Sequence, residues 1–247
     1  MSQLQQQLHH IANARRLEII PYIYKTVNGQ VHTGPFKGMT IVPKVTWGDG
    51  DIAAKLLGIY EDELHVFIND VSIHCPDLVI NVGCAEGYYA IGLARIIPTV
   101  SVIAVDINKA CADICQENSE ANNTTNVKVV LQEVDAAWLS KNLNASQRPF
   151  IVMDCEGAEL DLLNFDQVPE LAKTSVLVEC HDCIIPEITN TLRQRFQDTH
   201  TIFQKDQTYK DAYQFDFLKQ FSDCDKWALV HEGRPSTMSW LYMTPKQ

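Results

Sequence analysis

Short apolar runs alternate with stretches of helical periodicity from Asp77 onward, and this alternation restricts the possible folds more than any other feature. The runs are mostly apolar and rich in Val and Ile, which indicates strands buried on both faces. They cover residues 77–83, 101–106, 127–135, 149–154 and 175–180. Buried strands separated by helices predict an α/β fold with a mostly parallel central sheet, right-handed crossovers and helices on both faces.

Two further runs near the C-terminus, HTIFQK and SWLYMTP, have strand composition and predict a terminal antiparallel pair. The first 75 residues have a different organisation and predict a small cap. Leu4, Leu8, Ile11 and Ala12 recur at helical spacing, which favours an amphipathic helix that packs on the body or on a second copy in a homodimer.

Residues 18–46 are punctuated by Gly and Pro, and the runs PYIYKTV and GMTIVP between them predict an irregular β element. Helical periodicity returns over 52–70. We therefore divide the chain into a cap and substrate lid, residues 1–75, and a cofactor-binding domain, residues 76–247. Lys37, Lys44 and Trp47 are the lid residues expected to give substrate choice.

Composition limits the partners. Hydrophobic residues make up 46% of the chain and charged residues 21%, as in globular proteins, and the net charge of −11 repels the phosphates of nucleic acid. Neither an 18-residue apolar run nor an apolar leader segment is present, so we expect a cytoplasmic protein without a membrane partner. The eight cysteines are then expected to be reduced, including the C-x-x-C pair Cys180 and Cys183.

The first strand is followed by Gly83-Cys84-Ala85-Glu86-Gly87, whose two glycines allow a tight turn and a close approach of backbone to a ligand. The spacing lacks both the dinucleotide fingerprint and the phosphate-binding P-loop. That absence disfavours an NAD-dependent dehydrogenase. The loop alone is also compatible with simple turn chemistry.

Acidic residues stand at the ends of the strands that follow. Asp106 ends the second strand, where a carboxylate can accept hydrogen bonds from ribose hydroxyls, although it could equally cap the next helix. Asp135 follows the third strand, and either contact with an adenine amino group or a helix N-cap would explain it. The fourth and fifth strands end in Asp154-Cys155-Glu156 and Glu179-Cys180-His181. These side chains are expected to share one edge of the sheet.

The motifs DCEGAE and VECHD, with the flanking runs GPFKGMTI, KLLGIYEDEL and EGRPSTMSWLYM, resemble the FkbM-like family of class I S-adenosylmethionine-dependent methyltransferases. The resemblance spans roughly Thr33 to the C-terminus. It implies a Rossmann-like methyltransferase fold, S-adenosyl-L-methionine as cofactor, and O-methylation of a sugar or natural-product hydroxyl.

The resemblance also implies residue roles. Gly83, Cys84, Glu86 and Gly87 would line the methionine end of the cofactor, and Glu61 would close over it. Asp106 and Ile107 would hold the ribose, and Asp135 would face the adenine. Asp154 would lie near the methyl group, with Glu156, Glu179 and His181 on the acceptor side.

The unperturbed pKa of a histidine side chain suits a general base, so His181 is the candidate for that role, and Glu179 or Asp154 could orient its ring. Asp154, Glu156, Glu179 and His181 could instead hold Mg²⁺ or Mn²⁺, which would acidify an acceptor hydroxyl. Two other functions stay open at this point. One is N-methylation of a small molecule or peptide, and the other is a non-catalytic adenosine-binding scaffold.

Overall fold

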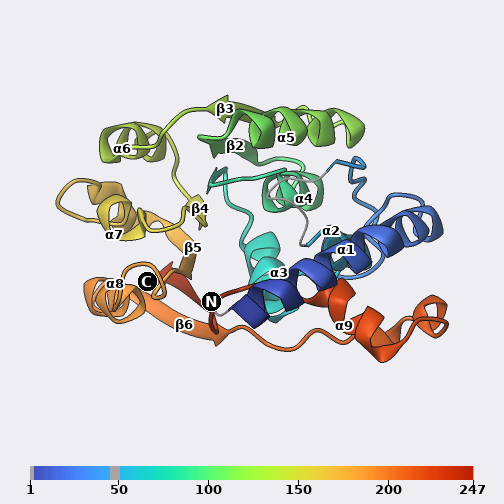
Figure 1. Cartoon of the computed structure of the whole chain (residues 1–247). Helices are drawn as coiled ribbons and strands as arrows, with labels where there is room; N and C mark the ends of the chain where they lie inside the picture. The colour runs from blue at the N-terminus through green and yellow to red at the C-terminus, as the bar shows by residue number, and fades with distance from the viewer. Residues whose placement is uncertain (1–2, 45–50, 247) are drawn as a thin grey trace.

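The computed structural model describes residues 3–44 and 51–246, and its centre is a seven-stranded sheet (Figure 1). The strand order is β3-β2-β1-β4-β5-β7-β6. All neighbouring pairs from β3 to β5 are parallel, and β7 runs antiparallel between β5 and β6. The strands are β1 Leu78–Val82, β2 Ser101–Asp106, β3 Val127–Leu131, β4 Pro149–Met153, β5 Ser175–Cys180, β6 His200–Asp206 and β7 Ser239–Pro245.

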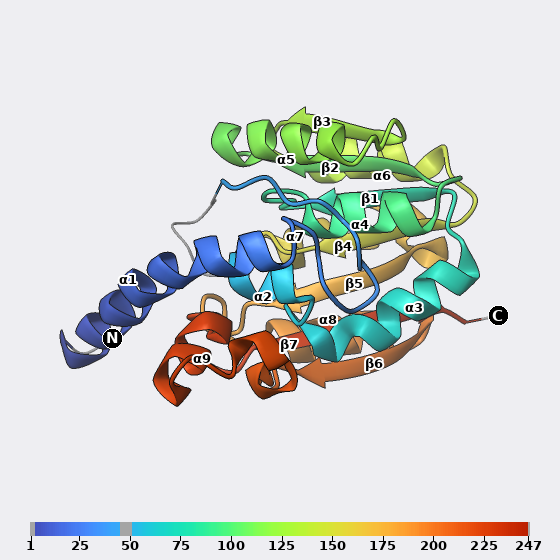
Figure 2. The same ribbon diagram turned by 90° about the vertical axis from the view of Figure 1, so that its right-hand side faces the viewer.

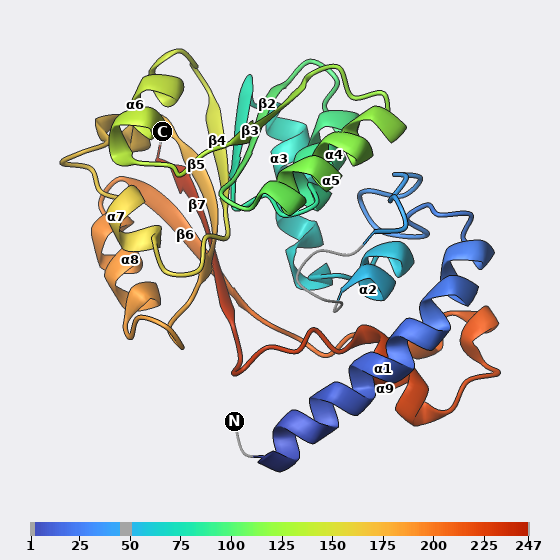
Figure 3. The ribbon, with the colours of Figure 1, turned by 45° about the horizontal axis from the view of Figure 1, so that its top comes forward.

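Helices cover both faces of this sheet, as Figure 3 shows. The α-helices are α1 Gln3–Thr26, α2 Ile52–Leu57, α3 His65–His74, α4 Tyr88–Ile96, α5 Lys109–Ala121, α6 Ala136–Asn144, α7 Glu159–Leu162, α8 Ile188–Phe196 and α9 Asp223–Val230. The 3₁₀ turns are η1 Asp62–Leu64, η2 Pro169–Lys173, η3 Ala212–Gln214 and η4 Asp216–Leu218.

Side-chain alternation along the strands builds two cores. Val79, Val102 and Val152 pack with residues of α2 to α5 on one face. Ile80 and Ile151 pack with residues of α6 to α8 on the other. Because β1, β4 and β5 bury both faces, their sequences are mostly apolar rather than alternating. The predicted α/β fold is confirmed, and so is the antiparallel pairing of the last two strands.

The N-terminal helix is longer than predicted and buries a different stripe. PYIYKTV, expected as β structure, continues α1 to Thr26 with Pro21 inside the helix. The expectation was wrong because Ile19, Ile23 and Val27 are spaced four apart and are all buried, which is a helical pattern. Of the four residues that suggested the helix, Ala12 is buried, whereas Leu4, Leu8 and Ile11 are exposed.

The rest of the N-terminal region also differs from the prediction. GMTIVP forms a single bridge, Gln30 to Thr40, and no strand. The helix expected over 52–70 is divided into α2, η1 and α3, because Gly58 closes α2 in the left-handed conformation (φ 79°). Trp47, expected in the lid, lies outside the described residues.

The proposed boundary at residue 75 crosses a shared core, since side chains of α2 and α3 pack in the same cluster as the sheet. Helices α1 and α9 pack together at one side of the sheet (Figure 2). In the described part of the chain, no helix combines the length and the hydropathy that a membrane span requires.

Candidate active site

The loop after β1 is fixed against its neighbours by backbone contacts. The N–H groups of Gly83 and Cys84 both donate to the Val105 carbonyl at 3.0 and 3.1 Å. Gly83 has a φ of 72°, and a Cβ there would collide with the Asp154 carbonyl oxygen. Only glycine therefore allows the β1 and β4 loops to approach each other this closely. The turn ends at Gly87, which precedes α4 with a φ of 87°.

Asp106 is buried at the end of β2 and holds this loop from the other side. Its Oδ2 accepts the Ala85 N–H at 2.9 Å, and its Oδ1 accepts the Asn108 N–H at 2.7 Å. Asn108, and not Asp106, is the N-cap of α5. Each Asp106 oxygen retains a second acceptor position. The neighbouring Ile107 is 75% exposed, so its side chain is available at the surface beside this carboxylate.

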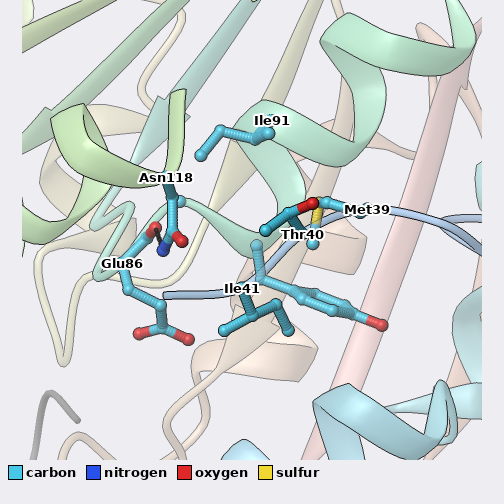
Figure 4. Close-up of a pocket in the computed structure, with 8 residues that line it drawn as sticks. Met39, Thr40, Ile41, Glu86, Ile91 and Asn118 are labelled. Atoms are coloured by element: carbon cyan, nitrogen blue, oxygen red, sulfur yellow. Dashed lines mark hydrogen bonds between the residues drawn. The ribbon is translucent and has the colours of Figure 1, made fainter. Parts of the chain in front are cut away.

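The segment that precedes α2 closes one side of the glycine loop (Figure 4). Asn118 of α5 and Asn122, the residue that caps the C-terminus of this helix, hold the segment in place. Their side-chain oxygens accept the N–H groups of Val42 and Thr40 at 2.7 and 2.8 Å. The cavity left between this segment, Glu86 and α4 has a volume of about 10 Å³. That volume holds about one water molecule, so the described part of this segment packs closely against the loop.

His181 lies at the centre of the acidic residues predicted for the acceptor side. It is almost fully buried, and its Nε2 lies 3.5 Å from Asp154 Oδ1, 3.3 Å from Glu156 Oε2 and 3.9 Å from Glu179 Oε2. The structure thus brings together the four side chains that end β4 and β5. Glu156 adopts a left-handed backbone conformation (φ 56°), a strained arrangement typical of functional loops.

Glu159, the first residue of α7, completes this cluster and has no role in the sequence-based prediction. Its Oε1 lies 2.7 Å from His181 Nδ1. Since a carboxylate only accepts, Nδ1 carries the proton and the second nitrogen, Nε2, faces Asp154 and Glu156. The DCEGAE motif contains Glu159, but nothing in the sequence indicates that it would reach a histidine 22 residues away.

Burial and neighbouring charge shift the pKa values of this cluster. Burial, together with the nearby Glu61 carboxylate, raises the pKa of Asp154 to about 7. Burial alone would lower the pKa of His181, but the hydrogen bond to Glu159 and the surrounding carboxylates outweigh it, so the pKa is raised. Burial would raise the pKa of Glu159, and the hydrogen bond from His181 outweighs it, so this pKa is lowered.

Arg234, also absent from the prediction, offsets part of the negative charge of the acids behind this cluster. Its guanidinium pairs with the buried carboxylates of Glu61 and Glu179 and, at 2.9 Å, with Glu232. The Tyr89 hydroxyl also donates to Glu61. Glu179 is therefore held by Arg234 rather than by His181. Glu61, expected to close over the cofactor, is a buried member of this network.

The remaining predicted residues have separate surroundings. Glu86 is buried and pairs with Lys55, which also pairs with Asp51 at 2.9 Å. Cys84 is buried. Asp135 is exposed and caps α6 by accepting the Trp138 N–H at 2.7 Å. Its place as an N-cap is the alternative that the sequence left open, and its contact with adenine stays a prediction.

Asp154, Glu156 and His181 each offer one ligand atom, and these three atoms lie within 4.8 Å of one another, a spacing that could hold a metal ion. Glu179, the fourth residue predicted for that purpose, faces Arg234 instead. The set of two carboxylates and one imidazole suits Mg²⁺ or Mn²⁺.

A mostly parallel sheet with an antiparallel β7, a glycine loop after β1 and an acid at the end of β2 are typical of α/β enzymes that bind a nucleoside at the carboxyl ends of their strands. Residues 79–178 match the family model described as a methyltransferase domain. The predicted S-adenosylmethionine-dependent methyltransferase is confirmed at this level, and its cofactor with it. No curated protein matches the chain.

Similar solved structures include three methyltransferases. Precorrin-6y C5,15-methyltransferase from Geobacter metallireducens is 12% identical, with a TM-score of 0.48 and coverage of 83% of this chain and 94% of that one. The O-methyltransferase TomG from Streptomyces achromogenes, involved in tomaymycin synthesis and solved with S-adenosylmethionine, is 11% identical, with a TM-score of 0.48 and coverage of 72% and 78%. An rRNA methylase from Streptococcus thermophilus is 10% identical, with a TM-score of 0.48 and coverage of 74% and 96%. Likenesses this distant do not define a substrate.

Proposed function

We propose that this chain transfers the methyl group of S-adenosylmethionine to a hydroxyl oxygen of a small molecule such as a sugar or another natural product, as its FkbM-like motifs imply. The observation that carries the proposal is the His181–Glu159 pair at the carboxyl edge of the sheet. The pair presents Nε2 beside Asp154, the residue that touches the glycine loop.

The residues at this edge suit the cofactor. The Asp106 oxygens have acceptor positions left for the ribose hydroxyls, and the loop from Gly83 to Gly87 offers backbone close to the methionine end. Four carboxylates surround His181, whereas Arg234 is the cation that the structure places on one of them. This excess of negative charge favours a positively charged sulfonium.

When bound, the cofactor supplies a methyl group activated by its sulfonium, so the protein mainly has to position the acceptor and remove its proton. His181 Nε2 would take the proton of the acceptor hydroxyl while the methyl group passes to that oxygen and its bond to the sulfonium sulfur breaks. The Glu159 carboxylate stabilises the resulting imidazolium through the Nδ1 hydrogen bond. General-base assistance of this kind contributes about 10²–10⁴-fold. Glu156, which is largely exposed, is placed to contact the acceptor.

Bound Mg²⁺ or Mn²⁺ is the second mode of assistance, favoured by the convergence of Asp154, Glu156 and His181. The two modes exclude each other at one atom, because Nε2 cannot bind a cation and accept a proton together. Activity that survives chelation assigns Nε2 to the base, and activity restored only by Mg²⁺ or Mn²⁺ assigns it to the metal.

The proposal is tested by incubating the protein with methyl-labelled S-adenosylmethionine and parallel panels of hydroxylated and amine-bearing small molecules. We expect label in a hydroxylated acceptor, a large loss of turnover in His181→Ala at nearly unchanged cofactor affinity, and no change in the exposed control His10→Ala. Label only in amines would establish N-methylation. Cofactor binding without transfer to any acceptor, including peptides, would favour a scaffold.

The acidic surface, with a net charge of −11, supports a small-molecule acceptor over nucleic acid. The exposed Leu4, Leu8 and Ile11 on α1 support the proposed homodimer. Sedimentation of the Leu8→Ser variant tests that contact, because loss of a dimer would assign it to this stripe.

A further inference from the structure

A second hollow of about 450 Å³ lies at the edge of the sheet opposite the candidate active site. Pro149 and Ser175, the first residues of β4 and β5, line it, and so does Thr244 near the end of the antiparallel β7. The volume is within the range of small-molecule sites. Because β4 has five residues at about 3.3 Å each, the hollow is about 16 Å from Asp154, too far for its occupant to be the methyl acceptor.

The hollow exists because α3 covers only part of this sheet face. Asp70 and His74 of α3 form one wall and Phe203 of β6 forms another, with the strands between them as the floor. Figure 2 shows α3 and β6 on this side of the molecule, near the C-terminus. Phe203 is 50% exposed although it lies on a strand, so an apolar ring is left uncovered.

The floor is aromatic. The Tyr242 ring is stacked on Phe67 at a centroid distance of 4.8 Å and an interplanar angle of 30°. Phe203 lies on the same side at 6.4 Å from Tyr242, with an angle of 26°. Phe67 and Tyr242 are buried, so the half-exposed Phe203 is the ring that offers a face to a planar ligand, and Tyr242 lines the hollow beside it.

Two cations stand at the strand-start end of the hollow. The described residues place no carboxylate within ion-pair distance of Arg148 or Lys173; Arg148 donates to the His74 carbonyl at 3.3 Å, and Lys173 donates to the Ser146 carbonyl. The one carboxylate in the wall, Asp70, is held by the Tyr242 hydroxyl at 2.7 Å and by His74 at 3.4 Å. Their positive charge therefore stands beside the hollow without a carboxylate of the described residues to offset it.

We propose that this hollow binds a small aromatic anion, with its ring against Phe203 and Tyr242 and its carboxylate or phosphate group between Arg148 and Lys173. A flat apolar body matches the aromatic floor, and the negative group matches the two cations. The hollow is separate from the candidate active site, so this proposal does not depend on the proposed function.

The test uses calorimetry on the full chain with three probes that share one ring system: 2-naphthoate, 2-naphthyl phosphate and the neutral 2-naphthalenemethanol. We expect at least one anion to bind at least tenfold more tightly than the alcohol, and the stronger of the two identifies the preferred anionic group. Arg148→Met with Lys173→Met should abolish that preference. Phe203→Ser should weaken all three probes, since this half-exposed side chain can be changed without emptying the core.

Lys205→Met on the same edge strand is the matched control, because Lys205 is exposed and does not line the hollow. It should bind the probes like the wild type, and S-adenosylmethionine affinity should be unchanged in all variants. Equal affinity for anions and alcohol, or undiminished anion binding after loss of both cations, would overturn the proposal. So would self-association through β6 that Phe203→Ser abolishes, since a second copy would then cover the hollow.

Discussion

Replacement of Asp106 by alanine should cost most of the affinity for S-adenosylmethionine. In the proposed complex the carboxylate accepts a hydrogen bond from each ribose hydroxyl, and hydrogen bonds to a charged group contribute about 1.5–3 kcal/mol each. Two such bonds amount to about 3–6 kcal/mol. At about 1.4 kcal/mol per tenfold, even the lower bound predicts a rise in Kd of more than a hundredfold.

The structure adds a second consequence that has to be separated from the first. Asp106 also accepts the backbone N–H groups of Ala85 and Asn108, so its loss loosens the glycine loop and the start of α5. Asn108→Ala is the matched control, because it removes the N-cap of the same helix, at a cost of about 1 kcal/mol of stability, without removing a ribose contact. Its Kd should stay within about threefold of the wild type.

Calorimetric titration with S-adenosylmethionine measures both variants, and a thermal melt of each confirms that it is folded. Asp106→Asn should give an intermediate Kd, since one neutral oxygen acceptor remains. A folded Asp106→Ala variant whose Kd is close to that of the wild type would refute the ribose role and with it the predicted orientation of the nucleoside.

Four further outcomes are expected. Glu159→Gln should lower kcat about tenfold, because a neutral hydrogen bond stabilises the imidazolium about 1.4 kcal/mol less than a charged one. The pKa of His181 should also fall without the Glu159 carboxylate, so the rising limb of the pH–rate profile should move to lower pH. Chelation should leave turnover unchanged, as measured by label transfer after treatment with EDTA. Arg234→Met should cost about 3–5 kcal/mol in urea unfolding, because Glu61 and Glu179 stay buried without their cation. Burial raises the pKa of Glu232 to about 8 from an ordinary 4.5, so the unfolding free energy of the wild type should fall between pH 4.5 and 8, and Glu232→Gln should flatten that fall.

The body of the fold could be predicted because its signals are local and repeated. The central parallel strands β1, β4 and β5 bury both faces, so they stand out as apolar runs between helices. The acids after these strands then had to share an edge, and the distances around His181 confirm that grouping for Asp154, Glu156 and Glu179.

The N-terminal region misled the prediction because two patterns overlap in it. PYIYKTV is rich in aromatic and β-branched residues, which favour strands, and it contains a proline, which disfavours helices. Burial of Ile19, Ile23 and Val27 on one helical stripe outweighs both preferences. This is tertiary packing, and a single sequence shows it only as a spacing that competes with stronger local signals.

The partners that tune the site were beyond reach for a different reason. Arg234 pairs with Glu61 across 173 residues, and Lys55 pairs with Glu86 across 31. Ion pairs between residues so far apart leave no periodic pattern in the sequence. The sequence therefore showed an excess of acids but not which cations pair with them. That difference changes the chemistry: Glu61 and Glu179 share the single positive charge of Arg234, whereas Asp154 and Glu156 keep facing His181. The negative charge left at the edge is therefore concentrated around one imidazole, where a hydroxyl proton has to be removed, rather than spread over every strand end.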